Sequence, residues 1–248
     1  MKKSKLSSEI LFNFIISKDF KFILIYCLVI MATLLGDELL EGNFFEYLYT
    51  AYASFSIFAI SAGIAIVYET IKIYFNIYNN PNYLMRYKKR VDILKEIILA
   101  SIKVGLVILC EYFLAAVFLS ILKGNFTFQN VATKIYKMQI IDLVVITMLR
   151  LSMFVIASQC LTIYVLQIIK KKEIVIILTV LMYALVPFSF FLESNSILDC
   201  ILPAFHVHAW GIAKTYISNI IYSVAYYSVI TGGILFMLNI NSKKNKII

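Results

Sequence analysis

Charged residues, proline, tryptophan and histidine are all scarce in this sequence. Only 15% of its 248 residues are Asp, Glu, Lys or Arg, and 62% are hydrophobic. A soluble domain averages roughly 25% charged and 45–50% apolar, so the composition excludes an ordinary soluble domain and indicates an integral membrane protein. The sequence also has no GxxxxGK[ST], HExxH or GxSxG motif. We therefore expect neither an enzyme nor a cofactor bound to this chain.

The few cysteines and histidines do not form a recognisable site. The four cysteines are scattered along the chain, at Cys27, Cys110, Cys160 and Cys200. Three of them fall inside predicted membrane spans, so neither a disulfide framework nor a metal-ligand set is implied. His206 and His208 are two residues apart and could in principle bind a metal. Because no third ligand lies near them, we expect an interfacial pair without metal.

The apolar residues form solid runs of about twenty rather than alternating ten-residue segments, which favours membrane-spanning helices over an outer-membrane barrel. The first run is not followed by a small-residue cleavage site, so it is expected to be retained in the protein. The prediction is an all-α integral membrane protein with one domain over residues 1–248. Its six spans lie at about 22–36, 51–71, 97–122, 140–169, 174–192 and 216–238.

The basic residues indicate how the helices are oriented. Lys and Arg gather at both chain ends and in alternate loops, which places both termini on the cytoplasmic side of a cell membrane. The net charge is +9. Because the lysines adjoin apolar runs, we expect them to interact with lipid headgroups rather than with nucleic acid. Residues 5–18 form an amphipathic stretch, with Leu6, Phe14 and Ile15 on one stripe and Glu9 opposite. This stretch predicts an interfacial helix before the first span.

Two further segments have unusual compositions. The second span is rich in small residues, and Ala59 with Gly63 forms a small-xxx-small pair that predicts close packing against another helix. Residues 193–215 are apolar although they lie on the outer side, and Pro203 interrupts them. Non-helical backbone at membrane depth must be covered by protein or water, so this segment is expected to be a broken, re-entrant helix.

The longest polar interruption of the apolar pattern is the stretch 72–95. Asn80 followed by Pro81 is a helix-start signal, and Tyr83, Leu84 and Tyr87 recur at helical spacing among basic residues. A solvated loop that only obeys the positive-inside rule is one interpretation. A short helix that docks on a cytoplasmic partner is the other. The tight basic turn 170–172 shows that topology needs only a few residues, which favours docking.

Glu111 and Arg150 are the ionisable residues predicted deepest in the membrane. At 1.5 Å per residue, Glu111 lies about 21 Å from the inner end of its span and Arg150 about 12–15 Å from the outer end. These depths coincide in a hydrocarbon core of about 30 Å. An unpaired charge there costs roughly 2.5–3.5 kcal/mol. The sequence therefore predicts an intramembrane ion pair, either structural or along a transport path.

This layout resembles that of ABC type-2 permeases, the membrane subunits of many bacterial exporters. The resemblance covers nearly the whole chain and is carried by the sequence YET at 68–70 and by NPNYLMRYKKRVDILKE at 80–96. It is similar to the small permeases that transport lantibiotics and other antimicrobial peptides in low-GC Gram-positive bacteria. The resemblance implies a coupling helix between the second and third spans, after Glu69. Its coupling residues would be Asn80, Pro81, Tyr83, Leu84, Arg86, Tyr87, Lys88, Lys89 and Arg90.

The resemblance also implies the partners. ATP and Mg²⁺ would be bound by a separate cytoplasmic ATPase subunit, and a second copy of the chain or a sister permease would complete the membrane path. The substrate would be a peptide or another amphipathic molecule, exported in secretion or in self-immunity. The alternative is a stand-alone membrane immunity or accessory protein that binds its target without ATP. An intramembrane enzyme would need a reactive cluster at one depth, and only Glu111 and Arg150 share one.

Overall fold

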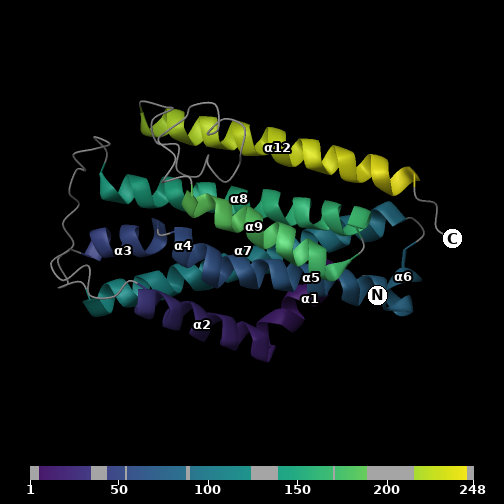
Figure 1. The fold of residues 1–248 in the computed structure, drawn as a ribbon, viewed down its shortest axis with the longest axis horizontal. Helices are drawn as coiled ribbons and strands as arrows, with labels where there is room; N and C mark the ends of the chain where they lie inside the picture. The colour runs from purple at the N-terminus through teal and green to yellow at the C-terminus, as the bar shows by residue number, and fades with distance from the viewer. Residues whose placement is uncertain are drawn as a thin grey trace.

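The computed structural model describes residues 6–34, 44–53, 55–87, 90–123, 139–169, 171–188 and 215–244. These residues form an elongated bundle of helices that run along its long axis (Figure 1). The predicted all-α class is confirmed. The elements are α1 (Leu6–Ile15), α2 (Lys18–Leu34), α3 (Phe44–Ala53), α4 (Phe55–Phe58), the π-helical segment η1 (Ala59–Gly63), α5 (Ile64–Tyr78), α6 (Pro81–Leu84), α7 (Arg90–Lys123), α8 (Ile140–Ile169), α9 (Lys172–Phe188) and α12 (Tyr216–Lys244).

Four described segments are long and apolar enough to cross a membrane: Ala59–Tyr78, Val91–Leu122, Ile140–Ile169 and Tyr216–Ser242. They correspond to the second, third, fourth and sixth predicted spans. Helices α2 and α9 correspond to the first and fifth, but each has 17 residues, about 26 Å of a core of about 30 Å. The chain is an all-α membrane protein, and the count of six spans stays a prediction.

The outward faces of the bundle are apolar, as contact with lipid requires. On α2 the exposed side chains include Phe22, Ile25 and Val29, which recur at helical spacing. On α9 they include Ile177 and Leu181. An apolar face of this kind would be costly against water and is favourable against hydrocarbon.

The polar stretch predicted at 72–95 is shorter in the structure. Helix α5 continues to Tyr78 because Ile73, Tyr74 and Ile77 are buried at helical spacing, and α7 already begins at Arg90. Only residues 79–89 therefore connect the two long helices. The predicted re-entrant segment 193–215 lies, apart from Thr215, outside the described residues.

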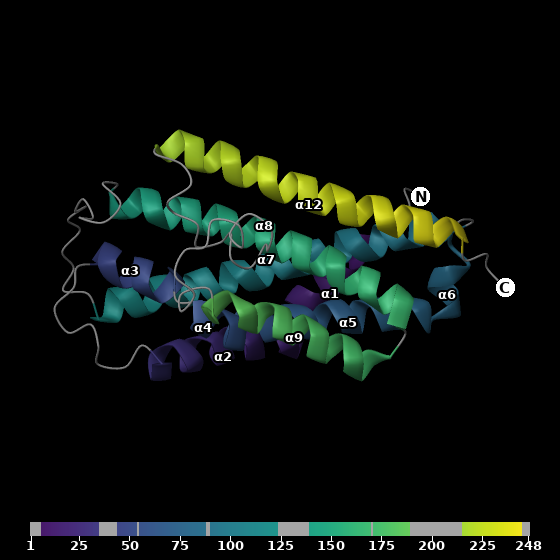
Figure 2. The same cartoon turned by 45° about the horizontal axis from the view of Figure 1, so that its top comes forward.

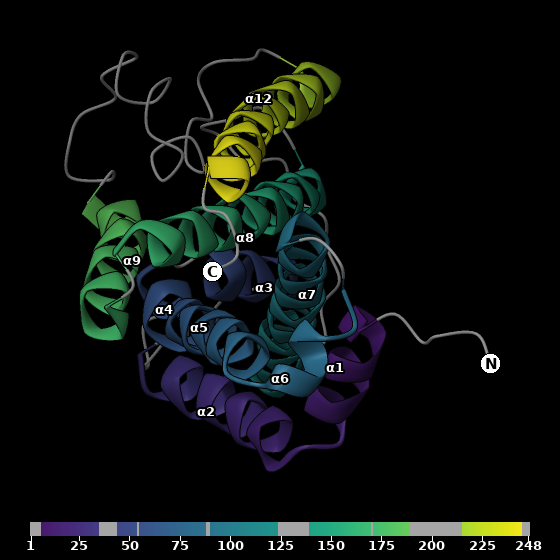
Figure 3. The same cartoon turned by 90° about the vertical axis from the view of Figure 1, so that its right-hand side faces the viewer.

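Helix α7 is the centre of the bundle. Its 34 residues extend about 51 Å, and it packs against α1, α2, α3, α5 and α8. Helix α12 lies at the periphery and packs mainly on α8, as the view along the bundle shows (Figure 3). The last turn of α12 and the short helix α6 lie at the same end of the bundle (Figures 1 and 2). We call this the α6 end.

Polar side chains join the central helices. Gln159 of α8 donates to the carbonyl oxygen of Ser101 on α7 at 2.7 Å and to the hydroxyl of Thr70 on α5 at 3.3 Å. Such bonds give buried polar groups the hydrogen-bond partners that hydrocarbon cannot supply. One amide thereby fixes three helices relative to one another.

The small residues of the second predicted span allow close packing, as expected. A Cβ atom on Gly63 would lie 2.7 Å from Cδ1 of Tyr183 on α9, so only glycine fits there. The Tyr183 hydroxyl is 2.7 Å from the hydroxyl of Ser158 on α8. On the other side of η1, the Tyr26 hydroxyl of α2 donates to the Ile60 carbonyl oxygen at 3.1 Å.

Replacing Gly105 by alanine tests the packing around Gln159. The added Cβ atom would lie 2.1 Å from Nε2 of Gln159, whose amide is already held by α5 and α7. We expect overpacking to cost about 1–3 kcal/mol, seen as a lower apparent melting temperature of the purified protein in detergent. The control is Gly232→Ala, since a Cβ there meets nothing within 4 Å. Equal melting temperatures for the two variants would contradict this packing.

Candidate functional site at the α6 end

Helix α6 begins where the sequence signal places it. Asn80 has an extended backbone, and its side-chain oxygen accepts a hydrogen bond from the backbone N–H of Asn82 at 3.0 Å. Pro81 follows at the first helical position, where its lack of an N–H has no cost. The predicted helix start is confirmed, and it sets the direction in which the connection 79–89 leaves the bundle.

The two faces of α6 differ. Tyr83 and Leu84 are partly buried and pack, together with Tyr87, against the hydrophobic core. Met85 at the C-terminal cap points the other way and is 77% exposed. The sequence reasoning singled out the three inward residues and missed Met85. The available signal was its position off the stripe that Tyr83, Leu84 and Tyr87 form.

Two predicted coupling residues contact α1. Arg86 forms an ion pair with Glu9 at 3.3 Å and lies over the Tyr83 ring, 5.2 Å from its centroid. The Tyr87 phenol interacts with the backbone of Leu6, and partial burial together with the Glu96 charge raises its pKa. Lys88, Lys89 and the side chain of Arg90 lie outside the described residues, so their roles stay predictions.

Helix α1 is fixed to α7 by its first turn. The backbone N–H of Ser7 donates to a carboxylate oxygen of Glu96 at 2.9 Å, and Lys103 donates to the hydroxyls of Ser7 and Ser8 at 3.3 and 3.2 Å. A carboxylate at a helix N-terminus also interacts favourably with the helix dipole. Leu6 and Phe14 are buried as predicted, but Ile15 is exposed together with Phe12 and Ile16, so the predicted stripe is only partly buried and apolar side chains also lie on the outer face of α1.

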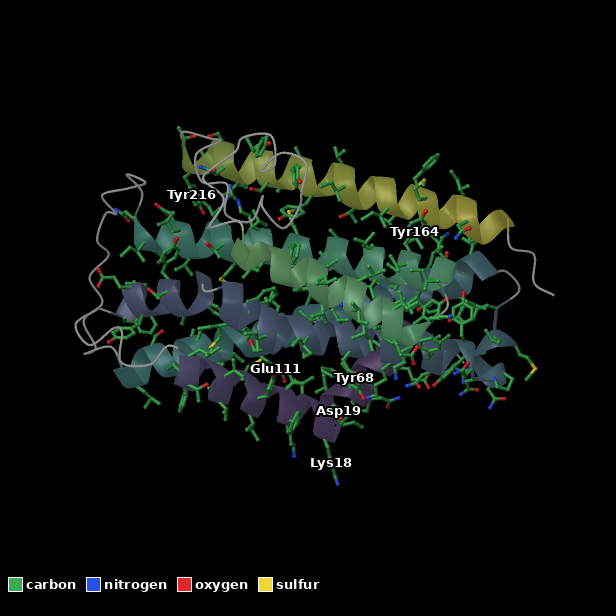
Figure 4. The ribbon with its side chains drawn as sticks, in the orientation of Figure 1. Lys18, Asp19, Tyr68, Glu111, Tyr164 and Tyr216 are labelled. Atoms are coloured by element: carbon green, nitrogen blue, oxygen red, sulfur yellow. The ribbon has the colours of Figure 1, made fainter. Side chains whose placement is uncertain are left out.

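A charged cluster joins the start of α2 to α5. Lys72 pairs with Asp19 and, at 3.2 Å, with Glu69. Glu69 is buried and lies inside α5, which continues beyond it rather than ending there as predicted. The cluster borders a cavity of about 200 Å³ that Asn13 of α1 and Tyr83 of α6 also line. Figure 4 shows Asp19 and Tyr68 close together beside this region.

These contacts make one connected site out of α1, α6 and the adjoining ends of α5 and α7. Comparison with protein-family models, curated proteins and solved structures gives no match to this chain. The likeness to ABC type-2 permeases is therefore a hypothesis that rests on the layout of the chain and on the contacts at the α6 end.

The predicted ion pair between Glu111 and Arg150 is not formed. Arg150, which is fully buried, donates to Oγ of Ser223 at 2.8 Å and to Oδ1 of Asn219 at 3.1 Å, both on α12. Both carboxylate oxygens of Glu111 are buried without a hydrogen-bond partner. Hydropathy estimates only the depth of a residue, whereas the rotation of each helix about its axis decides the partner, and Arg150 faces α12.

The remaining sequence predictions concern residues that the structure does not describe. Cys200, His206 and His208 lie in 189–214, so the expectation of a metal-free histidine pair stays a prediction. Among the described cysteines, Cys27, Cys110 and Cys160 are free thiols.

Replacing Glu96 by alanine tests how α1 is held. The change removes a charge-assisted hydrogen bond of about 1.5–3 kcal/mol. The population of molecules with α1 detached from α7 should therefore rise roughly tenfold or more. Trypsin cleavage after Lys18 in the detergent-solubilised protein should accelerate accordingly. Asp92→Ala is the matched control, because Asp92 is in the first turn of the same helix and makes no hydrogen bond to α1 among the described residues. An unchanged cleavage rate in Glu96→Ala would show that α1 is held by other contacts.

Proposed function

We propose that this chain is the permease subunit of an ABC exporter and that a separately encoded ATPase docks at the α6 end. The observation that carries the proposal is α6 itself. It is a capped helix outside the long apolar helices, with an exposed methionine and a strongly basic sequence after it. Methionine and arginine are enriched in protein interfaces, and nothing within the bundle requires Met85 to be exposed.

Contacts around α6 provide a route for transmitting movement. Helix α6 directly connects α5 and α7, and Arg86 and Tyr87 attach it to α1. The first turn of α1 is in turn bonded to Glu96 and Lys103 of α7. ATP-driven closure of the ATPase would move α6 and, with it, the adjoining ends of two long helices. Coupling further requires two conformations that the ATPase stabilises to different extents.

In this proposal ATP and Mg²⁺ are bound by the partner subunit, and a second permease copy or a sister permease completes the path. The substrate is an amphipathic or cationic peptide, or a lipid-like molecule, moved across the cell membrane of a low-GC Gram-positive bacterium in secretion or self-immunity. The alternative, a stand-alone immunity or accessory protein, leads to the opposite prediction, because its activity would survive depletion of ATP.

Substitutions at Met85 and in the basic sequence that follows α6 test the docking. We expect Met85→Glu, and separately Lys88→Glu with Lys89→Glu, to reduce co-purification with the ATPase encoded beside this chain about tenfold or more, because the first adds a charge to the proposed interface and the second reverses two charges there. ATP-dependent export in vesicles should fall in parallel. The control is Lys171→Glu with Lys172→Glu, an equal reversal in another exposed turn. If both α6 variants assemble and transport normally, the docking proposal is wrong.

A further inference from the structure

Glu111 is a buried acidic residue without a structural explanation. Its side chain is 3% exposed, and both oxygens lack a hydrogen-bond partner. Among the described residues, the other deeply buried acidic and basic side chains have partners: Glu69 pairs with Lys72, and Arg150 binds Ser223 and Asn219. Ionisable groups inside membrane spans are costly and commonly mark a substrate or ion site.

Among the residues that the structure describes, no cation lies beside Glu111. Cys27 of α2 is near enough to interact with the charge of Glu111, and the Cys27 thiol reaches Ser61 of η1. The Ser61 hydroxyl donates to the Ile57 carbonyl oxygen instead. Arg150 of α8 is directed to α12, so among the described residues Cys27 is the titratable group beside Glu111.

An apolar groove of about 380 Å³ lies between α2 and α7 and starts one helical turn beyond Glu111 on α7. Its walls include Leu24, Leu28, Leu114, Ala115, Phe118 and Ile121. On α7, positions 111, 114, 115 and 118 follow the i, i+3, i+4, i+7 spacing of a single helix face. On α2, Cys27 lies between the groove residues Leu24 and Leu28. Glu111 therefore lies one turn before the groove on α7, outside its lining, at the position labelled in Figure 4.

A π-helical segment adds a structural irregularity at the same place. Segment η1 (Ala59–Gly63) contributes Ser61 next to Cys27, and π-bulges are frequently found at functional sites. The groove opens toward the lipid-facing side, where Leu114 and Phe118 are exposed. Ala115 and Cys27 are buried, so a small separation of α2 from α7 would connect the groove to the carboxyl group.

We propose that Glu111 and the α2–α7 groove form a binding site for an amphipathic cation. The apolar part of the ligand lies in the groove, and its positive charge pairs with the Glu111 carboxylate. In the empty site the carboxyl group keeps its proton, since an unpaired charge in hydrocarbon is strongly disfavoured. Binding replaces that proton, which leaves to water. The site would hold the substrate of the proposed exporter and in that respect rests on the proposed function.

Binding of tetraphenylphosphonium, a permanently charged lipophilic cation, tests the site. Isothermal titration calorimetry on the purified chain in detergent, without any ATPase, should show saturable binding that weakens as the pH falls, because protons compete for Glu111. Glu111→Gln should weaken binding about tenfold or more by removing the charge pair. Phe118→Ala should weaken it less, by removing apolar contact. The matched control Asp142→Asn, which removes a carboxylate from the first turn of α8, should bind normally.

Dicyclohexylcarbodiimide, which modifies protonated carboxyl groups in apolar surroundings, gives a second measurement that needs no variant. It should label Glu111 and abolish binding, and bound tetraphenylphosphonium should protect Glu111 from it. The proposal is overturned if the native chain shows no saturable binding, if Glu111→Gln binds normally, or if neutral triphenylphosphine oxide binds equally well. That last result would mark the groove as a site for lipid chains. Because no ATPase is present, these outcomes are independent of docking at α6.

Discussion

The arrangement of this bundle depends on hydrogen bonds between polar groups that lie in an apolar medium. Apolar surfaces alone hold membrane helices together weakly, because lipid tails are as apolar as leucine. The polar contacts therefore specify which helices are neighbours. Gln159 joins α8 to α5 and α7, Tyr183 joins α9 to α8, and Arg150 joins α8 to α12. Each contact lies on α8, which explains why that helix organises one half of the bundle.

The sequence was sufficient to predict helix class, most helix positions and local signals. The fourth predicted span has the same bounds as α8, and Asn80 with Pro81 correctly marked the start of α6. Hydropathy measures how deep a residue lies, but not the direction in which it faces. For that reason Glu111 and Arg150 could be placed at matching depth and yet bind different neighbours. Helix ends were also misplaced where burial against protein, rather than lipid, continues the helix, as it does from Lys72 to Tyr78.

The α6 end shows the same limit in the candidate site. Tyr83, Leu84 and Tyr87 were recognised because they repeat at helical spacing, yet the structure directs them inward. The exposed residue is Met85, which lies off the stripe that those three residues form. The long-range contacts of Arg86 with Glu9 and of Ser7 with Glu96 join residues 77 and 89 positions apart. No local pattern encodes such pairs, since they exist only when α1 folds back over α7.

The bonds from Arg150 to α12 have a consequence for how the protein is made. Asn219 and Ser223 follow Arg150 by 69 and 73 residues, which ribosomes synthesise in roughly 4–15 s. During that interval α8 has been produced and two hydrogen-bond acceptors for its arginine have not. The insertion machinery must therefore keep this segment near water or protein until the last helix arrives. Biogenesis thus ends with the docking of α12, and a chain truncated before Tyr216 would leave a buried guanidinium without these two acceptors.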